Sequence, residues 1–360
     1  MKHPIHFLTT LLLLALLAAC APVETAAPVS NSAAPEEEAA VEEAAASHGG
    51  CEEGLRLLEH ALGADCVPMD IERVVEMGQL NTELLLAVGY RPVASNTILE
   101  QFLRDMFPEL DDEISAMTDG LPEYGFPPNL EVLLEADPDI FITHFTAPVF
   151  PEDIADTIAP EIGLDLATSW QENMLFVADL IGEREAAEQL IADYDERVAV
   201  LQELTPNREE ISVSIVRLQP DAFSIQLRDS MGGVIRAEVG LASPEAQRDV
   251  TDDLSNPHAG RVMQISLERV DLMDADVILF YGAAPTPEMR AENQALIESL
   301  ADDPLFQTLN AFRNDQVYLA GDYWDGGGGI ISAHAALDDL FRYVADVDPQ
   351  EVSPNPFLSK

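Results

Sequence analysis

The chain has 360 residues, with 66 acidic against 18 basic side chains, a net charge of −48 and a sequence pI near 4.1. Phosphate contacts require clustered Lys and Arg, so this charge excludes general nucleic-acid binding. Apart from Lys2 and Lys360, every basic residue is an arginine, whose planar fork matches a carboxylate. An arginine at the end of a strand is therefore a candidate for binding an anion.

Residues 1–20 combine Lys2, an apolar run from Phe7 to Ala19, and Cys20 in the sequence "LLAAC". The run of about 13 residues is shorter than the roughly 20 that a membrane-spanning helix needs. Small residues before a cysteine are typical of a lipoprotein signal peptide. We expect cleavage before Cys20 and lipidation of that cysteine; an ordinary signal peptide with a chance cysteine is the alternative.

Residues 21–50 are rich in Ala, Pro, Glu and Ser, and they predict a disordered acidic tether because they contain almost nothing to bury. About 300 residues remain, which is enough for two lobes. The segment "CEEGLRLLEHALGADCVP" predicts a hairpin around Leu62 and Gly63. In an exported protein Cys51 and Cys66 can form a disulfide, and two free thiols remain the alternative.

Strands and helices alternate over residues 51–170, which predicts an N-terminal α/β lobe. The expected elements are a strand in "RVVEMG", a helix ended by Gly89, a strand "RPVAS", a helical stretch 96–117 interrupted by Pro108, a helix 130–136 capped by Asn129, and a strand "DIFIT".

Residues 171–204 carry the longest helical periodicity and predict one rigid connecting helix, irregular near Gly182. Residues 205–346 predict a C-terminal α/β lobe, and residues 347–360 a tail. The expected elements of this lobe are strands 211–218 and 222–228, a helix 234–239, the segment "ISLERVDLMDADVILF", a helix 288–299, a strand 316–320 and a helix 331–344.

The segments "NLEVLLEADPDIFIT", residues 129–143, and "SLERVDLMDADVILF", residues 266–280, share one pattern of helix, Asp and apolar strand. This repeat predicts two related lobes that face each other. Ligands bind beyond the carboxyl ends of the strands in such sheets, so His144 and Tyr281, which follow the two strands, are candidates to line a cleft.

Two arginines and two aromatic residues should border the same cleft. Arg217 and Arg228 each end a strand and suggest an anionic ligand, although a pairing with a nearby acid would explain them equally. Tyr323 and Trp324 suggest a flat or bulky ligand face, unless they only pack beneath their loop.

Glu131 and Glu268 hold the same position in the two repeated segments, in the first turn of each expected helix. Stabilisation by the helix dipole alone would explain an acid there. Two such carboxylates would also suit docking onto a partner with two subunits.

The sequence lacks the nucleophile, phosphate-loop and zinc motifs of common enzymes, and its histidines are scattered without the spacing of a metal site. We expect no catalytic residue and no intrinsic cofactor. The Gly-rich run 326–329 lies ahead of a helix, where flexibility or close backbone packing explains it.

In order, the lipoprotein leader, the tether, "PPNLEVLLEADPDIFIT", the connecting helix, "VSIVRLQPDAFSIQLRDSMGG", "ISLERVDLMDADVILF" and "AFRNDQVYLAGDYW" resemble the substrate-binding lipoproteins of ATP-driven importers for ferric siderophores, haem and cobalamin. The resemblance implies two Rossmann-like lobes, one long rigid helix and a shallow cleft. It also implies that Glu131 and Glu268 dock on arginine pockets of the permease. The segment "VRLQPDAFSIQLRDSMGG" is most similar to members that bind ferric hydroxamates or ferric citrate.

We therefore expect a monomeric receptor on the outer face of a bacterial cell membrane, anchored by lipid. It would bind a ferric chelate, whose iron is held by the chelate, and deliver it to an ABC permease dimer with its ATPase. Alternatives are a receptor for haem, with His144 or Tyr281 as axial ligand, or for cobalamin. A surface α/β hydrolase or metal enzyme and an adhesion module are more distant alternatives.

Overall fold

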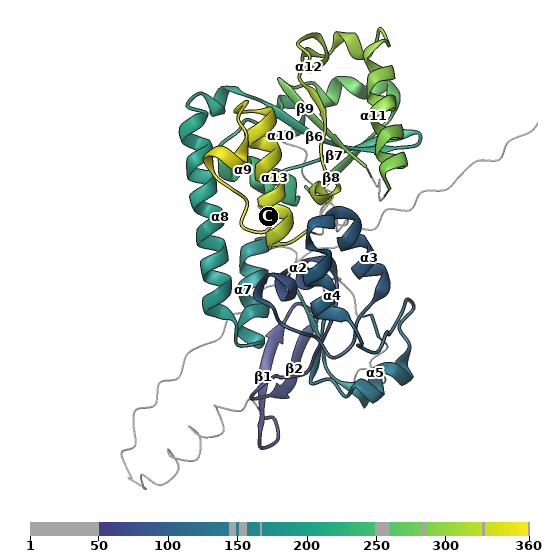
Figure 1. Ribbon diagram of the computed structural model, residues 1–360, viewed down its shortest axis with the longest axis vertical. Helices are drawn as coiled ribbons and strands as arrows, with labels where there is room; N and C mark the ends of the chain where they lie inside the picture. The colour runs from purple at the N-terminus through teal and green to yellow at the C-terminus, as the bar shows by residue number, and fades with distance from the viewer. Residues whose placement is uncertain are drawn as a thin grey trace, which may run out of the picture. The chain divides into compact units, whose positions relative to one another are not determined.

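The computed structural model describes residues 50–143, 149–150, 157–165, 168–248, 260–282, 286–325 and 328–358. All of them belong to one compact unit, Ala46–Lys360 (Figure 1). The predictions for Cys20, His144 and the tether up to residue 49 concern residues outside this set. Among the described residues, no helix has the length and apolar character needed to cross a membrane.

A disulfide-closed hairpin opens the compact unit. Strands β1 (Leu55–His60) and β2 (Gly63–Pro68) pair antiparallel, as the alternation in the sequence predicts. A disulfide joins Cys51 to Cys66, across a separation of 15 residues. Closing a loop of this length stabilises the folded state by about 3 kcal/mol, because it restricts the unfolded chain. His60 then attaches the hairpin to the next sheet, since its Nδ1 accepts from the N–H of Gly163 at 3.1 Å.

The N-terminal lobe is built on three parallel strands in the order β3-β4-β5, with every residue buried. The strands are Val74–Met77, Ile140–Thr143 and Glu161–Gly163, and the helices around them are α2 (Gln79–Val88), α3 (Thr97–Met106), α4 (Asp111–Thr118) and α5 (Leu130–Ala136). The predicted strand "RPVAS" is wrong: the segment contributes only an isolated bridge from Ser95 to Glu123. Pro92 lacks the N–H that a ladder needs, which accounts for the difference.

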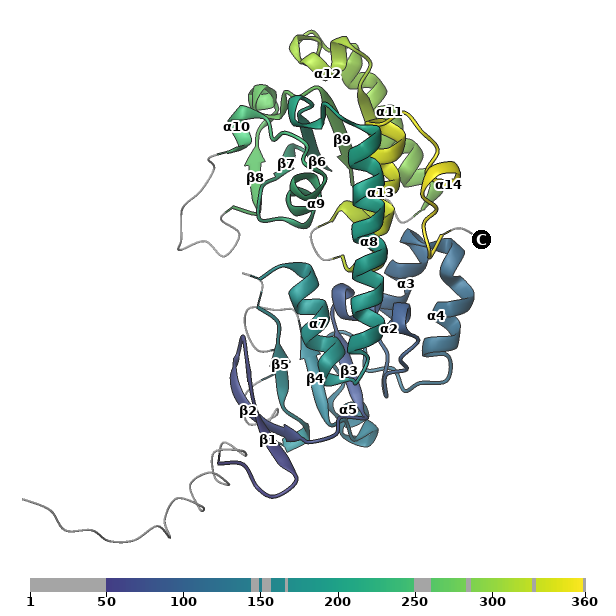
Figure 2. The same cartoon turned by 90° about the vertical axis from the view of Figure 1, so that its left-hand side faces the viewer.

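The connection between the lobes consists of two helices, which corrects the prediction of one helix over 171–204. Helix α7 (Trp170–Leu180) starts with a capping box of Ser169 and Glu172, and α8 (Arg184–Leu204) follows. Gly182 separates them with a φ of +76°, a left-handed conformation that interrupts the helical hydrogen bonds. Figure 2 shows α8 running alongside both lobes.

The C-terminal lobe has a mixed sheet in the order β10-β9-β6-β7-β8. Its strands are β6 (Val213–Gln219), β7 (Ala222–Gln226), β8 (Val262–Ile265), β9 (Val277–Tyr281) and β10 (Val317–Leu319), and its helices include α9 (Met231–Val239), α10 (Glu245–Arg248), α11 (Pro287–Ala301) and α12 (Asn310–Arg313). Strands β10, β9 and β6 are parallel, whereas β7 and β8 run antiparallel. The parallel strands therefore share one carboxyl edge, and β7 begins at that edge.

The repeated segments occupy corresponding places in the two sheets. Each ends in a central parallel strand, β4 between β3 and β5, and β9 between β10 and β6. The helical halves differ, because α5 is an α-helix whereas the C-terminal counterpart, η3 (Leu267–Met273), is a 3-10 helix interrupted at Arg269. The repeat thus predicts the placement of the strands better than the helix type.

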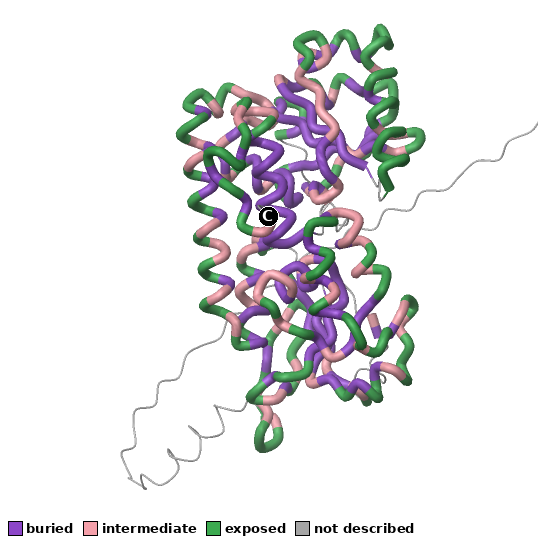
Figure 3. Tube along the Cα trace, viewed as in Figure 1, coloured by how far each residue is buried: buried purple, intermediate pink, exposed green. Residues whose placement is uncertain are grey.

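The lobes meet where α2 contacts the start of α13 (Ile330–Tyr343), a helix whose buried residues run from Ile330 to Phe341 (Figure 3). The residue before α13 is Gly329, which has no side chain to cap the helix. The fully buried carboxylate of Glu83 on α2 caps it instead. Glu83 accepts from the N–H groups of Gly329 and Ser332 at 2.9 and 2.8 Å, and from the Ser332 hydroxyl at 2.6 Å.

The glycines before α13 make this contact possible. A Cβ on Gly329 would lie 3.0 Å from the carbonyl oxygen of Leu80 and 3.1 Å from the Cβ of Glu83. A Cβ on Gly328 would lie 2.5 Å from that of Ser332. Close packing, one of the two explanations that the Gly-rich run allowed, therefore holds for these two glycines.

The C-terminal tail packs against α8 and α13. Arg197 on α8 is buried and donates to the carbonyl oxygens of His334, at 2.9 Å, and Ser353, at 3.1 Å. It also pairs with the carboxylate of Asp338, which in turn accepts from the Asn355 amide at 3.2 Å. The predicted tail therefore belongs to the core, together with the short helix α14 (Pro349–Val352).

We predict that Glu83→Ala destabilises the protein by about 3 kcal/mol or more, because the N–H groups of Gly329 and Ser332 would lose their buried acceptor. Urea unfolding of residues 46–360 measures this change. Glu203→Ala, on the exposed side of α8, is the control and should change the free energy of unfolding little. A loss below about 1 kcal/mol for Glu83→Ala would contradict the capping role.

A second prediction concerns Glu76 on β3, which is buried and accepts from the Thr82 hydroxyl at 2.7 Å. Burial raises the pKa of Glu76 to about 8 from a usual value of 4.5. The folded state therefore binds this proton more tightly, and the stability that results is complete below pH 4.5 and is lost as the pH rises through about 8.

Glu76→Gln keeps an oxygen for Thr82 but cannot titrate. Relative to the wild type, we expect the variant to gain on the order of 3 kcal/mol of unfolding free energy between pH 5 and pH 9. Urea titrations at both pH values measure this gain. A constant difference between the two proteins would show that Glu76 does not titrate in this range.

Candidate functional site

The best candidate for ligand binding is Arg217, near the carboxyl end of β6. The parallel pairing of β6 with β9 places Arg217 opposite Tyr281. The Arg217 side chain is 36% exposed, and its Nη1 lies 3.4 Å from Oδ2 of Asp325, which follows the 3-10 helix η5 (Asp322–Trp324). Strands β6 and β9 and the residue after η5 thus bring a partly exposed guanidinium and an acidic neighbour to one edge of the sheet.

Tyr281 lies beneath this edge. The residue is 2% exposed, and its hydroxyl accepts from Nε2 of Gln226 at 2.7 Å. Burial raises the pKa of the Tyr281 phenol, so it stays neutral at physiological pH. The prediction that Tyr281 lines an open cleft does not fit this burial, and the same burial speaks against Tyr281 as an axial haem ligand.

Gln226 connects the parts of the site. Besides Tyr281, its amide nitrogen donates to the carbonyl oxygen of Trp324, and its Oε1 accepts from the N–H of Gly232 at 3.0 Å. A Cβ on Gly232 would lie 2.5 Å from that same Oε1. One buried amide therefore fixes β7, β9, η5 and the first turn of α9 against one another.

Trp324 and Tyr323 have packing roles in this structure. Trp324 is 1% exposed, and its indole nitrogen donates to Asp339 of α13 at 2.9 Å. The ring of Tyr323 stacks on Phe107 of the N-terminal lobe, with 6.1 Å between centroids. Packing beneath the loop, the alternative that the sequence left open, therefore describes Trp324 in this structure, and a contact with ligand stays a prediction.

Arg228 does not join Arg217. Strand β7 is antiparallel to β6, and the register places Ser224 opposite Arg217. Arg228 follows the far end of β7, where it is exposed and pairs with the adjacent Asp229 at 2.9 Å. Arg217 and Arg228 each follow a strand segment and are expected at one cleft, but the antiparallel hairpin of β6 and β7 places them toward opposite ends of the strand pair.

Sequence reasoning also missed Gln226, Asp325 and Asp339. In the strand segment "SIQLR", Gln226 lies two residues from Ser224 and two from Arg228, so the three polar side chains are expected on the same face of the strand. This spacing is the one sequence signal for Gln226. Asp325 follows Trp324 directly. Nothing in the sequence marks Asp339 as the indole acceptor, since this contact depends on how α13 packs.

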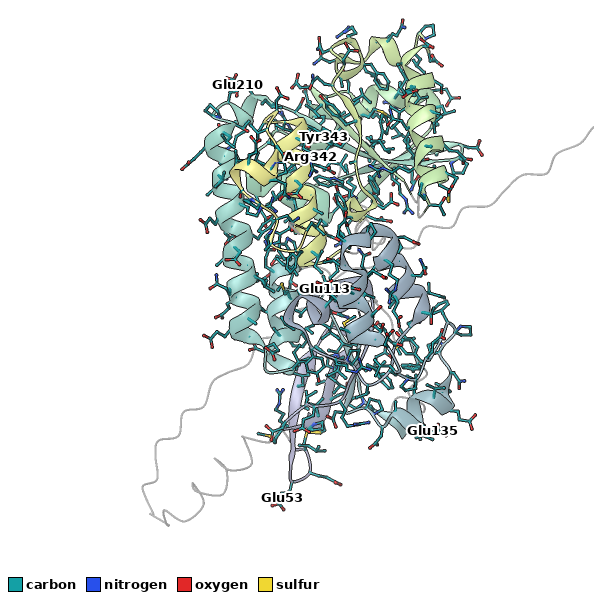
Figure 4. All side chains as sticks on the ribbon, viewed as in Figure 1. Glu53, Glu113, Glu135, Glu210, Arg342 and Tyr343 are labelled. Atoms are coloured by element: carbon teal, nitrogen blue, oxygen red, sulfur yellow. A yellow bond between two sulfur atoms is a disulfide. The ribbon has the colours of Figure 1, made fainter. Side chains whose placement is uncertain are left out.

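The described residues form the walls of two hollows. One, of about 610 Å³, has walls from both lobes and includes Arg104 of α3, Arg290 of α11 and Arg342 of α13. The other, of about 260 Å³, lies on the N-terminal lobe and is mostly apolar, with Ile98, Leu99, Tyr124 and Phe126 in its wall. Figure 4 shows Arg342 at the end of α13 beside Tyr343.

Both expected docking residues are exposed in the first turns of their helices. The side chain of Asn129 caps α5 by accepting from the N–H of Glu131 at 3.1 Å. In the C-terminal lobe, a hydrogen bond from Ser266 lowers the pKa of Glu268. Both positions can therefore present a carboxylate at the surface, and their docking role stays a prediction.

The described residues contain no group of His, Cys, Asp and Glu side chains arranged to hold a metal ion. Two α/β lobes joined by helices, with an arginine near the carboxyl edge of a sheet, define the class of two-lobe solute-binding proteins. Residues 108–323 match the model of the periplasmic binding protein family, and the chain belongs to that family. The expected family and the two-lobe α/β fold are thereby confirmed, whereas the single connecting helix is replaced by α7 and α8.

Three similar proteins illustrate the family. The chain is 28% identical over 294 residues to the probable siderophore-binding lipoprotein YfiY of Bacillus subtilis, covering 80% of this chain and 87% of YfiY. It is 25% identical over 301 residues to the achromobactin-binding periplasmic protein of Dickeya dadantii, covering 80% and 92%. The structure of Staphylococcus aureus SirA with staphyloferrin B has a TM-score of 0.64 at 21% identity, covering 80% and 98%.

Proposed function

We propose that this protein is a lipid-anchored receptor on the outer face of the cell membrane that binds a ferric chelate and delivers it to an ABC permease. The observation that carries this proposal is the partly exposed guanidinium of Arg217 near the carboxyl edge of the C-terminal sheet. A guanidinium there suits the carboxylate or other oxygen atoms of an anionic chelate. Two relatives named for siderophore or achromobactin binding support the ligand class.

The receptor acts as a monomer and performs no chemistry of its own. Iron enters and leaves as part of the chelate, so the protein needs no resident metal. The names of the relatives, one a lipoprotein and one a periplasmic protein, support a location outside the cytoplasm and anchoring through Cys20. Ferric citrate and ferric hydroxamates are the chelates to test first.

We predict that ferric citrate or a ferric hydroxamate quenches the fluorescence of residues 46–360 in a saturable way, through Trp170 and Trp324. Arg217→Gln should weaken this binding about tenfold or more, since a charge-assisted hydrogen bond contributes roughly 1.5–3 kcal/mol. Arg313→Gln, an exposed arginine on α12, is the matched control and should bind like the wild type.

Haem and cobalamin belong in the same titration. Saturable binding of either one, without binding of the ferric chelates, would replace the ligand class and keep the receptor. Failure of all four compounds to bind would withdraw the receptor proposal.

We further predict that the double variant Glu131→Arg with Glu268→Arg abolishes uptake of the labelled chelate by cells and leaves its affinity unchanged. The reversed charges would repel the arginines expected on the permease. A matched control reverses two other exposed acids, Glu53 and Glu210, which Figure 4 labels on different parts of the chain. Normal uptake by the first variant, or equal loss in both, would rule out specific docking through Glu131 and Glu268.

A further inference from the structure

Arg217 makes little use of its hydrogen-bonding capacity. Within the part of the chain that the structure describes, its guanidinium donates no hydrogen bond, and its one ion pair is the 3.4 Å contact with Asp325. Arg197, by contrast, is buried and donates to two backbone carbonyls as well as to Asp338. Arg197 is fully engaged by the fold, whereas Arg217 keeps donors that a ligand can use.

The backbone that leads to Asp325 is held in place by hydrogen bonds, which positions its side chain beside Arg217. The N–H of Asp325 donates to the carbonyl oxygen of Asp322 at 2.9 Å, and the preceding residue, Trp324, is buried and bonded to Asp339. The backbone on the N-terminal side of Asp325 is therefore held. The Asp325 side chain is 35% exposed, so its carboxylate borders water as well as the guanidinium.

The ion pair is weak enough to exchange. Pairs between partly exposed side chains contribute at most about 1 kcal/mol, and water screens this one because both partners are a third exposed. A ligand carboxylate that bonds two guanidinium nitrogens gains more, because bidentate charge-assisted hydrogen bonds are shorter and stronger. Replacing Asp325 with such a group is therefore favourable.

We propose that Asp325 is an internal substitute for a ligand carboxylate: it pairs with Arg217 in the empty receptor and is displaced when a carboxylate-bearing ferric chelate binds. This inference rests on the proposed function and assigns the ligand a free carboxylate. Asp325 then sets specificity as well as affinity. A chelate without a free negative group leaves the pair intact, whereas a chelate with one gains Arg217.

The test compares Asp325→Asn with the wild type in titrations of residues 46–360 with ferric citrate. Asn keeps the size of Asp and removes its charge. We expect binding about fivefold tighter, which corresponds to the loss of a competing pair worth roughly 1 kcal/mol. Binding of ferrioxamine B, a hydroxamate chelate without a free carboxylate, should not change.

Two further variants make the result specific. Asp271→Asn removes an exposed acid that pairs with Arg269 at 2.9 Å in the same lobe, and it should bind ferric citrate like the wild type. In an Arg217→Gln background, Asp325→Asn should bring no gain, because the competition no longer exists. A gain that persists in that background would point to general charge repulsion and overturn the proposal.

The remaining outcomes separate this inference from the function itself. If the wild type binds ferric citrate and Asp325→Asn binds it equally or more weakly, the substitute role is wrong and the receptor function stands. If the wild type binds ferrioxamine B but not ferric citrate, the free carboxylate is wrong. If the wild type binds neither, the ferric-chelate ligand class of the proposed function fails, and this inference fails with it.

Discussion

The hydrogen bonds between the Glu83 carboxylate and the start of α13 hold the two lobes together at their junction. Glu83 belongs to α2 of the N-terminal lobe, yet it caps α13, the helix that follows the last strand of the C-terminal sheet. Burial raises the pKa of Glu83 because it disfavours the charged carboxylate, and the hydrogen bonds to this carboxylate offset part of that effect. A buried carboxylate without these donors would destabilise the folded state. Moving the lobes apart would break this set of hydrogen bonds together, which favours a receptor that changes shape little.

The same joint positions the candidate site. Helix α13 begins at the Glu83 cap, and one turn from its far end Asp339 holds the indole of Trp324. Trp324 in turn offers its carbonyl oxygen to Gln226, which also bonds Tyr281 opposite Arg217 in the sheet. Helix α13 and the buried hydrogen bonds from Asp339 to Tyr281 therefore connect the lobe junction with the strand that pairs with Arg217. We infer that these buried residues fix the backbone position of Arg217, whose partly exposed guanidinium can respond to a ligand.

How much of this the sequence could predict differs between backbone and side chains. The repeated segment predicted two central parallel strands, and the alternation at 51–68 predicted the hairpin, because both patterns are local and periodic. The break at Gly182 was visible only as an irregularity. The burial of Trp324 and Glu83 could not be predicted, because their hydrogen-bond partners lie on helices that are distant in the sequence. Arg228 failed for a topological reason, the antiparallel return of β7.

The arginines show why geometry must decide between structure and function in so acidic a chain. Arg73 and Arg91 donate to backbone carbonyl oxygens near the ends of α5 and α4, and Arg197 is enclosed by the core. In Arg73 and Arg91 the planar fork donates to more than one carbonyl oxygen at once, which a lysine could not match in the same geometry. Arg217 has the same chemistry, but among the described residues its side chain pairs only with Asp325, at 3.4 Å, because it lies at a sheet edge. The net charge of −48 repels anions in general, so an anionic chelate binds only if its interaction with Arg217 outweighs both this repulsion and the pair with Asp325.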